Sequence, residues 1–298
     1  MCKSNVTNLQ KIFDLVSKNL AQNEKHFKGI HLFVQKSQGE TELVFNQNSL
    51  ADLTFNEIYA EGFTKLSTNA FIKLGSTLKL FICSPCEIAN SPPNYDVWKS
   101  LTKLTQTNTL SIDLDVNEIP SNAFQSVNQS QLNSVRLTSK QNLIIKSNTF
   151  LNLNNLNQVT IESKLINRIE KNAFRFDKEL NTTLTIEFSN TILSGDSYEN
   201  GTFDGIFRPL SFRFWFANID YIPESTFKSI LNDKRSSIVF APAENSFIDC
   251  EDCRNQWLIT NNKDNQVESA FCKGKLNNKL FDSSIKTRLS IKCKSKFN

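Results

Sequence analysis

Short runs of alternating apolar residues recur along the middle of the chain at a nearly constant spacing. Residues 132–137 read LNSVRL, and residues 156–161 read LNQVTI. Each run predicts a short β-strand, because alternate residues of a strand face the same side. A further apolar residue follows most runs, and then a segment such as IEKNAF at 169–174. Each unit is therefore expected to be a strand followed by a returning arc.

An aromatic residue at the end of each arc gives the period of the repeat. These aromatics lie 24 to 29 residues apart, at Phe71, Trp98, Phe124, Phe150, Phe174, Phe203 and Phe227. A unit of this length cannot bury its apolar edge alone, so successive units are expected to stack. The strand residues would share one core, and the rings would form a column on the outer side.

The pattern L-x-x-L-x-L, followed by an apolar residue and then by [IL]-x-x-N-[AT]-F, resembles the leucine-rich repeat in its short extracellular form. The resemblance implies an α/β fold: a curved leucine-rich repeat solenoid of about eight coils, each of 24–29 residues. A concave parallel β-sheet and an irregular convex side with the Phe column are expected. Many family members carry an inward asparagine after the strand. Other residues stand there in this chain, so no asparagine ladder is expected at Lys140, Lys164, Ser189 and Ala217.

The repeat divides the chain into three segments. We expect an amino-terminal cap or lead-in at 1–40, leucine-rich repeats at 41–245 and a cysteine-containing cap at 246–298. Apolar positions among polar ones at 7–34 predict an amphipathic helix or an irregular lead-in. The sixth unit is lengthened by SGDSYENGTFDG at 194–205, which predicts a protruding loop.

Composition and charge narrow the class of protein. Glycine is scarce, with 8 residues, which disfavours doubly wound nucleotide-binding folds and their glycine-rich turns. Residues 273–298 carry eight Lys or Arg and one acid, a balance of 8 − 1 = +7, which leaves 4 − 7 = −3 for the rest. This basic end is either a solvated face or a surface that meets a sulfated glycan or another anionic surface. No apolar stretch is long enough to span a membrane.

Four of the seven cysteines lie near the end of the chain, in the order Cys250-x2-Cys253-x18-Cys272-x20-Cys293. The spacing allows three disulfide connectivities. The alternative is a zinc site, but such sites normally use two close pairs, and only the first pair is close here. Following a run of repeats, this segment resembles the carboxy-terminal cap of extracellular leucine-rich repeat proteins. The resemblance implies the pairs Cys250–Cys272 and Cys253–Cys293, with a short helix starting at Trp257 and Leu258 over the last open coil.

The remaining cysteines leave alternatives open. Cys83 and Cys86 have the spacing of a redox motif, but their position after a predicted strand favours a local disulfide or two thiols. Cys2 stands alone, and the start MCKSNVTNLQ lacks the apolar run of a signal peptide. We therefore expect a secreted, extracellular protein whose sequence is incomplete at its amino terminus. Candidate glycosylation sites are the sequons at Asn5, Asn128, Asn181 and Asn200.

Residues 184–227, the cysteine cap and VESAFCKGK at 267–275 resemble an arthropod group of small secreted leucine-rich proteins. These are similar to the non-catalytic, larger subunit of the deep-sea shrimp oplophorus luciferase. The most specific part is an FxGxxRP box at Phe203, Gly205, Arg208 and Pro209. The resemblance implies an extracellular protein without catalysis of its own, because the light-producing chemistry belongs to the other subunit.

Few residues in the chain suit catalysis. The two histidines, His26 and His31, lie in the lead-in, and no serine elbow, phosphate loop or metal-spaced His pair is found. We expect neither an enzyme nor a cofactor. Binding on the concave strand face is the usual role of the fold. The residues expected to point there are Arg136, Thr138, Thr160, Glu162, Thr185, Glu187, Arg213 and Trp215.

Trp215 beside Arg213 is the best hot-spot candidate on that face, unless Trp215 packs on a neighbouring coil or the cap. The first hypothesis is a secreted scaffold for a protein or glycan partner. The second is a non-catalytic accessory subunit that stabilises an unrelated secreted enzyme, as in a luciferase-type monooxygenase complex. The third is a cytosolic zinc-capped repeat protein. No nucleic-acid partner is expected.

Overall fold

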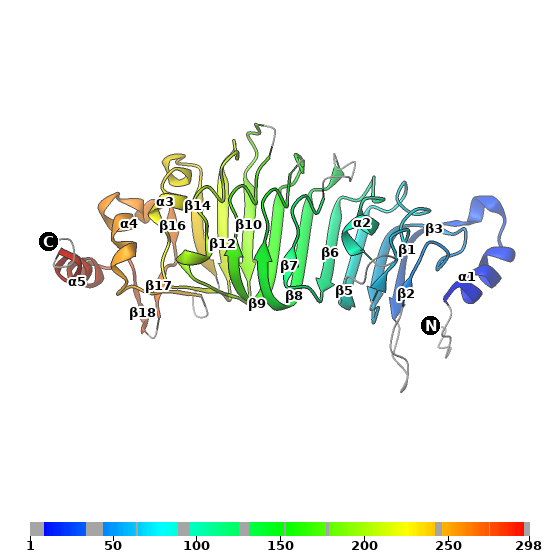
Figure 1. Ribbon diagram of the computed structural model, residues 1–298, viewed down its shortest axis with the longest axis horizontal. Coiled ribbons are helices and arrows are strands. Elements are labelled where there is room, and N and C mark those ends of the chain that lie inside the picture. Colours follow the sequence, from blue (N-terminus) through cyan, green and yellow to red (C-terminus); the bar gives the residue numbers. More distant parts are fainter. Residues whose placement is uncertain are drawn as a thin grey trace. The chain divides into compact units, whose positions relative to one another are not determined.

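The computed structural model describes residues 9–33, 44–63, 65–88, 96–124, 131–151, 153–176, 179–241, 246–273 and 275–294. The chain divides into two compact units. Unit 1 comprises Met1–Val116 with Ala123–Thr138, and unit 2 comprises Asn117–Asn122 with Ser139–Asn298. Both units are built mainly from parallel strands, so the fold is α/β with a large parallel β-sheet (Figure 1).

Unit 1 has four long strands in the sheet order β1-β3-β5-β6, each parallel to the next. A separate two-stranded parallel pair joins β2 to β4. The elements of unit 1 are α1 (Leu9–Lys18), η1 (Gln22–Glu24), β1 (His26–Phe33), β2 (Val44–Phe45), β3 (Thr54–Glu61), β4 (Lys65–Leu66), β5 (Leu80–Ile88), α2 (Val97–Leu101) and β6 (Thr109–Leu114). The next strand, β8 (Ser134–Ile145), is divided between the units, with 134–138 in unit 1 and 139–145 in unit 2.

The lead-in contributes the first strand of the sheet, because β1 pairs with β3, with Phe27 opposite Phe55 and Leu32 opposite Ala60. In β5, Phe81, Cys83 and Cys86 are buried, whereas Leu80 is partly exposed.

Unit 2 begins with β7 (Glu118–Ile119), which pairs with the end of β8. Its further strands are β9 (Gln158–Ile169), β10 (Leu184–Ser189), β11 (Ile192–Leu193), β12 (Leu210–Trp215), β13 (Asn218–Ile219), β14 (Ser237–Ala241), β15 (Phe247–Ile248), β16 (Val267–Glu268), β17 (Phe271–Cys272) and β18 (Lys275–Lys279). Its helices are η3 (Gly195–Ser197), α3 (Glu224–Phe227), η4 (Ile230–Asn232), η5 (Cys253–Asn255), α4 (Gln256–Thr260), η6 (Lys263–Asn265) and α5 (Ser283–Lys294). The long strands lie side by side in Figure 1.

Unit 2 is built from repeating segments, each called a coil below. Most coils contribute a long strand, a bend and then a short strand, as β10 with β11 and β12 with β13 do. The long ladder runs β9, β10, β12, β14, β16, and the short ladder runs from the end of β9 through β11, β13 and β15 to β17. The bends fall at Asn190 and Phe216, which take φ of 47° and 51°. The bends therefore turn the chain from one face of the coil to the next.

The outer arcs of unit 2 are held by a third row of backbone hydrogen bonds. Asn148 N–H donates to the Asn172 carbonyl at 3.0 Å, and Asn172 N–H donates to the Gly201 carbonyl at 2.9 Å. All three residues have positive φ, at 57°, 59° and 81°. Asparagine and glycine are the residues that adopt this left-handed conformation most readily. The asparagine of the repeated N-[AT]-F segment is therefore explained by its backbone.

Successive aromatic rings are in contact in unit 2, as expected. The centroid distances are 5.0 Å for Phe150–Phe174, 5.5 Å for Phe174–Phe203 and 5.5 Å for Phe203–Phe227. Phe150, Phe174 and Phe227 are fully buried. The ring column is therefore part of the core, beneath the outer arcs.

The segment at 194–205 is packed against the coil, so the expected protruding loop is wrong. Tyr198 is 6% exposed and Thr202 is fully buried. The Tyr198 ring lies 5.3 Å from the Phe227 ring and 6.0 Å from the Phe203 ring. The extra residues thus add apolar contacts inside the coil instead of extending into solvent.

A cap of short helices closes the carboxyl end of unit 2. The expected short helix is confirmed as α4, in which Trp257 and Leu258 are buried. The indole Nε1 of Trp257 donates to the Ile222 carbonyl at 2.8 Å. Asn255 is fully buried: its Oδ1 accepts from Ile222 N–H at 2.9 Å, and its Nδ2 donates to the carbonyls of Asp220 and Asp249. The cap is thereby tied to the last coil through side chain to backbone bonds.

The structure places six cysteines in three pairs at disulfide-bonding distance. The pairs are Cys83–Cys86 in unit 1 and Cys250–Cys272 and Cys253–Cys293 in the cap. The two cap pairs have Cα–Cα distances of 5.2 and 5.5 Å and are the pairs that the family resemblance implies. Cys2 lies outside the described residues. In the part of the chain that the structure describes, no helix is both long and apolar enough to cross a membrane.

Candidate functional site

The outward face of β10 and β12 holds four of the eight residues predicted to bind a partner. Glu187 lies opposite Arg213 in the parallel register, and Thr185 lies opposite Ser211. Thr185 and Glu187 are partly exposed, whereas Arg213 and Trp215 are exposed. The inward residues Ile186, Phe188, Phe212 and Phe214 are fully buried. The alternation of the strands therefore presents a row of polar side chains ending at one tryptophan.

Trp215 is exposed at the end of β12, and an exposed aromatic neighbour accompanies it. Both Trp215 and the next residue, Phe216, are 41% exposed, and their rings meet edge to face at 5.8 Å. Side chains of successive strand residues normally point to opposite faces, but the bend at Phe216 changes this. Ile192, 55% exposed, follows the equivalent bend of the neighbouring coil. Trp215 is therefore not fully buried against a neighbouring strand or the cap, and part of its ring is open to solvent.

The predicted site loses one residue. Thr160 on β9 is 3% exposed, and its Oγ1 accepts from Gln158 Nε2 at 3.3 Å. Its side chain is short, and the longer Gln158 and Glu187 lie beside it, so it is covered on the sheet surface. Glu162, further along β9, is partly exposed, and its Oε1 accepts from Asn190 Nδ2 at 2.8 Å. Glu162 thus remains on the face and Thr160 does not.

Other predicted site residues are placed as follows. Arg136, exposed, and Thr138, partly exposed, lie on the part of β8 that belongs to unit 1. Asn181 and Asn200 are exposed in unit 2, as glycosylation would require. Asn5 and Asn128 lie outside the described residues.

The short ladder of unit 2 forms a second surface, with a hollow of about 440 Å³. Its outward residues include Leu165, Ile192, Asn218 and Phe247, which are neighbours in the parallel register. A parallel row two residues further along each coil is polar and lines the same hollow, with Asn167, Ser194, Asp220, Asp249 and Lys273. The hollow therefore has one row in which Leu165, Ile192 and Phe247 are apolar and a second row that is polar.

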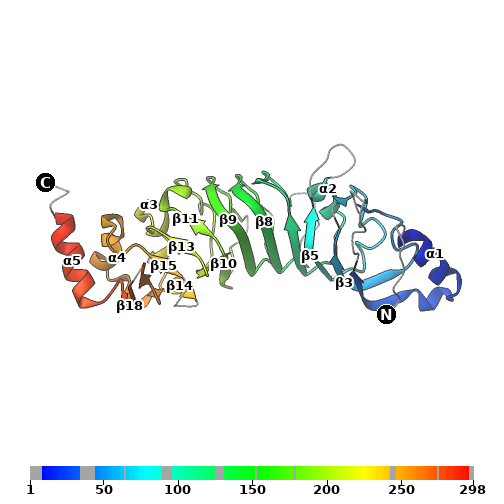
Figure 2. The same ribbon diagram turned by 90° about the horizontal axis from the view of Figure 1, so that it is seen from below.

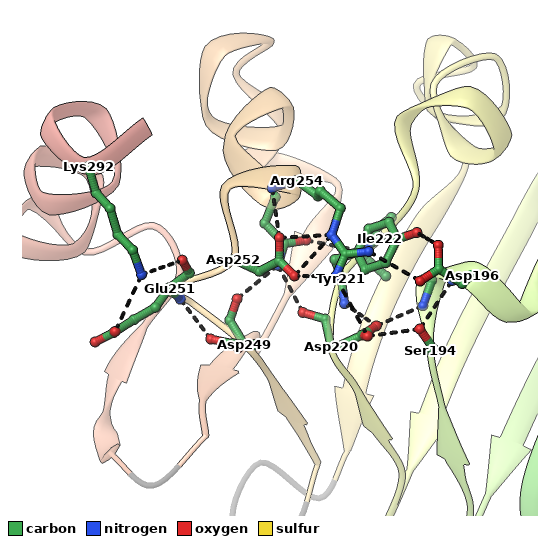
Figure 3. A network of polar contacts seen from close by, with 12 residues as sticks. Ser194, Asp196, Asp220, Tyr221, Ile222, Asp249, Glu251, Asp252, Arg254 and Lys292 are labelled. Carbon is green, nitrogen blue, oxygen red and sulfur yellow. Dashed lines mark hydrogen bonds and ion pairs between the residues drawn. The ribbon is translucent and has the colours of Figure 1, made fainter. Parts of the chain in front are cut away.

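A polar network beside this hollow connects the segment after β11 to the cap (Figure 3). The Arg254 guanidinium lies 3.5 Å above the centre of the Tyr221 ring and pairs with Asp252 at 2.6 Å and Asp196 at 3.3 Å. Tyr221 Oη donates to Asp196 at 2.5 Å. Gly195 packs on the other side, where a Cβ atom would overlap the Tyr221 ring. Tyr221 is therefore enclosed between a glycine and an arginine.

Asp220 supplies the second half of the network. Its carboxylate accepts from Gly195 N–H at 2.7 Å and from the Ser194 hydroxyl at 2.8 Å. Asp249 accepts from Glu251 N–H at 2.8 Å, and the Glu251 carboxylate faces Lys292 of α5. The contacts of Asp220 with Gly195 and Ser194, and that of Glu251 with Lys292, join segments that are separate in the sequence. The arrangement stabilises the junction between coil and cap.

The protonation states in the network follow from these contacts. Burial raises the pKa of Tyr221 to about 12, and its hydrogen bond to Asp196 acts in the same direction. The Tyr221 hydroxyl and the Arg254 charge hold the pKa of Asp196 below its usual value, against a smaller opposing effect of burial. Arg254 has a raised pKa because Asp252 accepts its hydrogen bonds. At neutral pH the network thus consists of a neutral phenol, carboxylates and a guanidinium.

The two histidines each have a hydrogen-bond partner in unit 1. His31 Nε2 lies 3.0 Å from Glu61 Oε1, and His26 Nδ1 lies 2.9 Å from Thr54 Oγ1. Among the described residues, no group of three or more His, Cys, Asp and Glu side chains is placed to hold a metal ion.

Sequence reasoning missed Phe216, Ile192 and the Arg254 network. The signal for Phe216 and Ile192 lay in the residues directly after each long strand, where a bend exposes side chains that a continuous strand would bury. Arg254 could not be paired from the sequence, because Asp196 and Tyr221 lie 58 and 33 positions before it. Comparison of the sequence with models of known protein families gives no match, and comparison with curated proteins gives none either.

Proposed function

We propose that this protein is a secreted leucine-rich repeat scaffold that binds a protein or glycan partner through the outward face of β10 and β12. The observation that carries the proposal is the exposed Trp215, with Phe216 and Arg213 beside it. Tryptophan and arginine are the residue types most enriched at binding hot spots. An exposed aromatic pair at the end of a strand that also carries an exposed charged side chain suits both protein surfaces and sugar rings.

Several features support the leucine-rich repeat architecture that this proposal assumes. Consecutive long strands are parallel, and their starts are separated by between 24 residues (134 to 158) and 30 residues (237 to 267). The arcs repeat a left-handed asparagine or glycine, the rings stack beneath them, and a cap covers the last coil. These are the properties of a stack in which each unit contacts mainly its neighbours.

Secretion is supported by the three cysteine pairs among the described residues. Disulfides form and persist in oxidising compartments, whereas cytosolic proteins keep most thiols reduced. Separate pairs also disfavour the zinc-capped alternative, which needs four thiolates around one ion. The exposed sequons at Asn181 and Asn200 agree with the same compartment.

The proposal can be tested by affinity capture with the purified full chain as bait. The wild-type protein and the variants Trp215→Ala and Arg213→Ala are exposed to extracellular fluid from the source tissue and to an array of purified glycans. Phe207→Ala is a matched control, because Phe207 is an aromatic residue that is 60% exposed but lies outside β10 and β12. Bound partners are identified by quantitative mass spectrometry, and their Kd values are then measured with purified components.

We expect Trp215→Ala to weaken binding about 30-fold, which corresponds to a hot spot of about 2 kcal/mol. Phe207→Ala should leave the Kd unchanged, and neither variant should change the melting temperature by more than a few degrees. A partner that binds the Trp215→Ala and Arg213→Ala proteins as tightly as the wild type would contradict the assignment of this face.

The accessory-subunit hypothesis involves the same surface. The segment 184–227 that resembles the arthropod group includes both Arg213 and Trp215. The most specific box of that segment is packed, with Arg208 only 7% exposed and bonded to the Leu156 carbonyl, so it supports the fold more than binding. An enzyme recovered at fixed stoichiometry in the capture experiment would favour the accessory role, and a receptor or a glycan would favour the scaffold role.

A further inference from the structure

The last helix of the cap, α5, has one face packed inward and one face open. Ile285, Leu289 and Cys293 are buried, and Cys293 is paired with Cys253. Figure 2 shows α5 at the end of unit 2, next to α4, with which it is in contact. The disulfide and the buried side chains hold α5 in one orientation. The opposite face is therefore presented to solvent in a fixed position.

A shallow hollow of about 520 Å³ lies along this open face. It is lined by Ser283, Ser284, Thr287, Arg288, Ile291 and Lys292. Three of these residues carry hydroxyl groups, two are cationic and one is apolar. Positive charge and hydroxyl groups thus occupy the same surface.

Glu251 contacts both cations of the hollow. Glu251 lies 3.5 Å from Arg288 and 3.6 Å from Lys292, and the Lys292 ammonium also donates to the Glu251 carbonyl. One carboxylate shared between two cations leaves net positive charge on the face. Like charges four residues apart on a helix are unfavourable by themselves. Asp282 is the only acidic residue in the sequence of 273–298, which also contains Lys279 and Lys286.

The composition of the face indicates which anionic partner it suits. Helices that lie on lipid surfaces present a broad apolar face to the membrane. The apolar residues of α5 are instead buried inside the cap, and Ile291 is the exception, at 70% exposed. Hydroxyl groups and spaced cations on a rigid helix match a polymer that carries both hydroxyls and sulfate groups. Sulfate oxygens accept the charge-assisted hydrogen bonds that arginine and lysine donate.

We propose that the open face of α5 binds a sulfated polysaccharide, with Arg288 and Lys292 as the principal sulfate contacts. This site is separate from the face of β10 and β12 and does not depend on the partner proposed there. It would place the protein in a sulfated extracellular matrix or on a cell surface while the strand face remains available.

The test uses heparin as a heavily sulfated probe and the full-length chain with its disulfides intact. The wild type should bind heparin in a salt-dependent manner and should not bind chemically desulfated heparin. The double variant Arg288→Gln with Lys292→Gln is expected to bind heparin about tenfold more weakly at near-physiological salt, since several exposed charge contacts are lost. The charge-matched control Lys28→Gln with Lys79→Gln removes two exposed charges from unit 1 and should bind as the wild type does.

The double variant also removes the ion pairs of Arg288 and Lys292 with Glu251, which could disturb α5. A second variant therefore tests the same surface with these ion pairs retained. Ile291→Glu introduces a carboxylate into the hollow and leaves both ion pairs in place, so it should also weaken heparin binding, whereas Ile291→Ala should not. Circular dichroism and thermal melting confirm that each variant is folded. Heparin binding that is unchanged in the folded double variant and in Ile291→Glu would overturn the proposal. Equal losses in both double variants, or tighter binding to anionic lipid vesicles than to heparin, would also overturn it.

Discussion

The outer arcs and the cap of unit 2 both depend on asparagine, but they use different parts of the residue. In the arc, Asn172 contributes its backbone: it takes φ of 59°, donates its N–H to Gly201 and accepts from Asn148. In the cap, Asn255 has an ordinary backbone and contributes its side chain, which makes three hydrogen bonds to backbone groups while fully buried. The same residue type therefore has two different structural roles in this protein.

The difference shows why one asparagine is repeated and the other is not. A left-handed turn can be supplied by asparagine or glycine, and the next coil indeed has Gly201 at this position. The Asn148 side chain confirms that the backbone matters there, because its buried Oδ1 accepts no hydrogen bond. A buried amide that pairs with one donor and two acceptors has no such substitute. Substitutions at the two sites should therefore follow different rules.

Asn255→Ala should have the largest effect. It leaves the buried Ile222 N–H without its partner and removes one of the two donors to each of the carbonyls of Asp220 and Asp249. A buried group left unpaired costs about 1–3 kcal/mol and each lost hydrogen bond about 1 kcal/mol, so we expect the free energy of unfolding to fall by about 4 kcal/mol. Asn255→Gly should be as damaging as Asn255→Ala, because the side chain is what matters. Urea denaturation measures the change, with the exposed Asn265→Ala as a control. A loss below about 1 kcal/mol would contradict the role assigned to the amide.

Loss of the Cys250–Cys272 disulfide tests the covalent contribution to the same cap. The two cysteines are 22 positions apart, and closing a loop of that size stabilises by roughly 3 kcal/mol. The double variant Cys250→Ala with Cys272→Ala should therefore lower the free energy of unfolding by about that amount. If the cap unfolds as a unit, the same variant should also increase amide hydrogen exchange in α4. Unchanged exchange in α4 would mean that the amide of Asn255 and the Trp257 packing hold the cap without this disulfide.

Much of the fold could be predicted because the apolar residues of the repeat are the ones that form the core. The runs at 132–137 and 156–161 overlap the beginnings of β8 and β9, since burial on one side of a strand requires alternation. The ring contacts follow from the same repeat, whereas the α4 helix was implied by the resemblance of the cap to that of other leucine-rich repeat proteins. The prediction was wrong where a segment departs from the period. The extra residues at 194–205 were expected in solvent, but Tyr198 and Thr202 are buried.

The candidate site was less predictable, because the repeat requires apolar residues only at inward positions and leaves the residue types at outward positions open. Arg213 and Trp215 could be placed outward by counting alternate positions along β12. The burial of Thr160 depends on the size of the side chains beside it, and the exposure of Phe216 depends on a bend with φ of 51°. Neither is encoded in the alternation of one strand. Such features arise from neighbouring coils, whose register is known only from the structure.

Asn172 provides the complementary test in the arc, with a smaller expected effect. Asn172→Gly should change the free energy of unfolding by less than about 0.5 kcal/mol, because glycine adopts positive φ without strain. Asn172→Ala should cost about 1 kcal/mol, the penalty for a left-handed alanine. Chemical denaturation of the two variants and the wild type provides the comparison. If glycine and alanine destabilise equally, then the Asn172 side chain matters, and the contrast with Asn255 fails.

The smallest effect is expected from acid titration of Asp196, which joins the coil to the cap. Its folded-state pKa is depressed, chiefly by the Tyr221 hydroxyl and then by Arg254. The stabilisation is therefore fully present above the unfolded-state pKa, near 3.8, and is lost as the pH falls through the lower folded-state value. Because the Asp196 side chain is 74% exposed, its contribution should be below about 1 kcal/mol. Unfolding free energies measured from pH 6 down to about pH 2.5 should fall less steeply for Asp196→Asn than for the wild type. If the unfolding free energies of the two proteins fall equally with pH, then the charge of Asp196 does not stabilise the cap. The remaining contacts of the network in Figure 3, such as those of Arg254 with Asp252 and with the Tyr221 ring, would then account for its contribution.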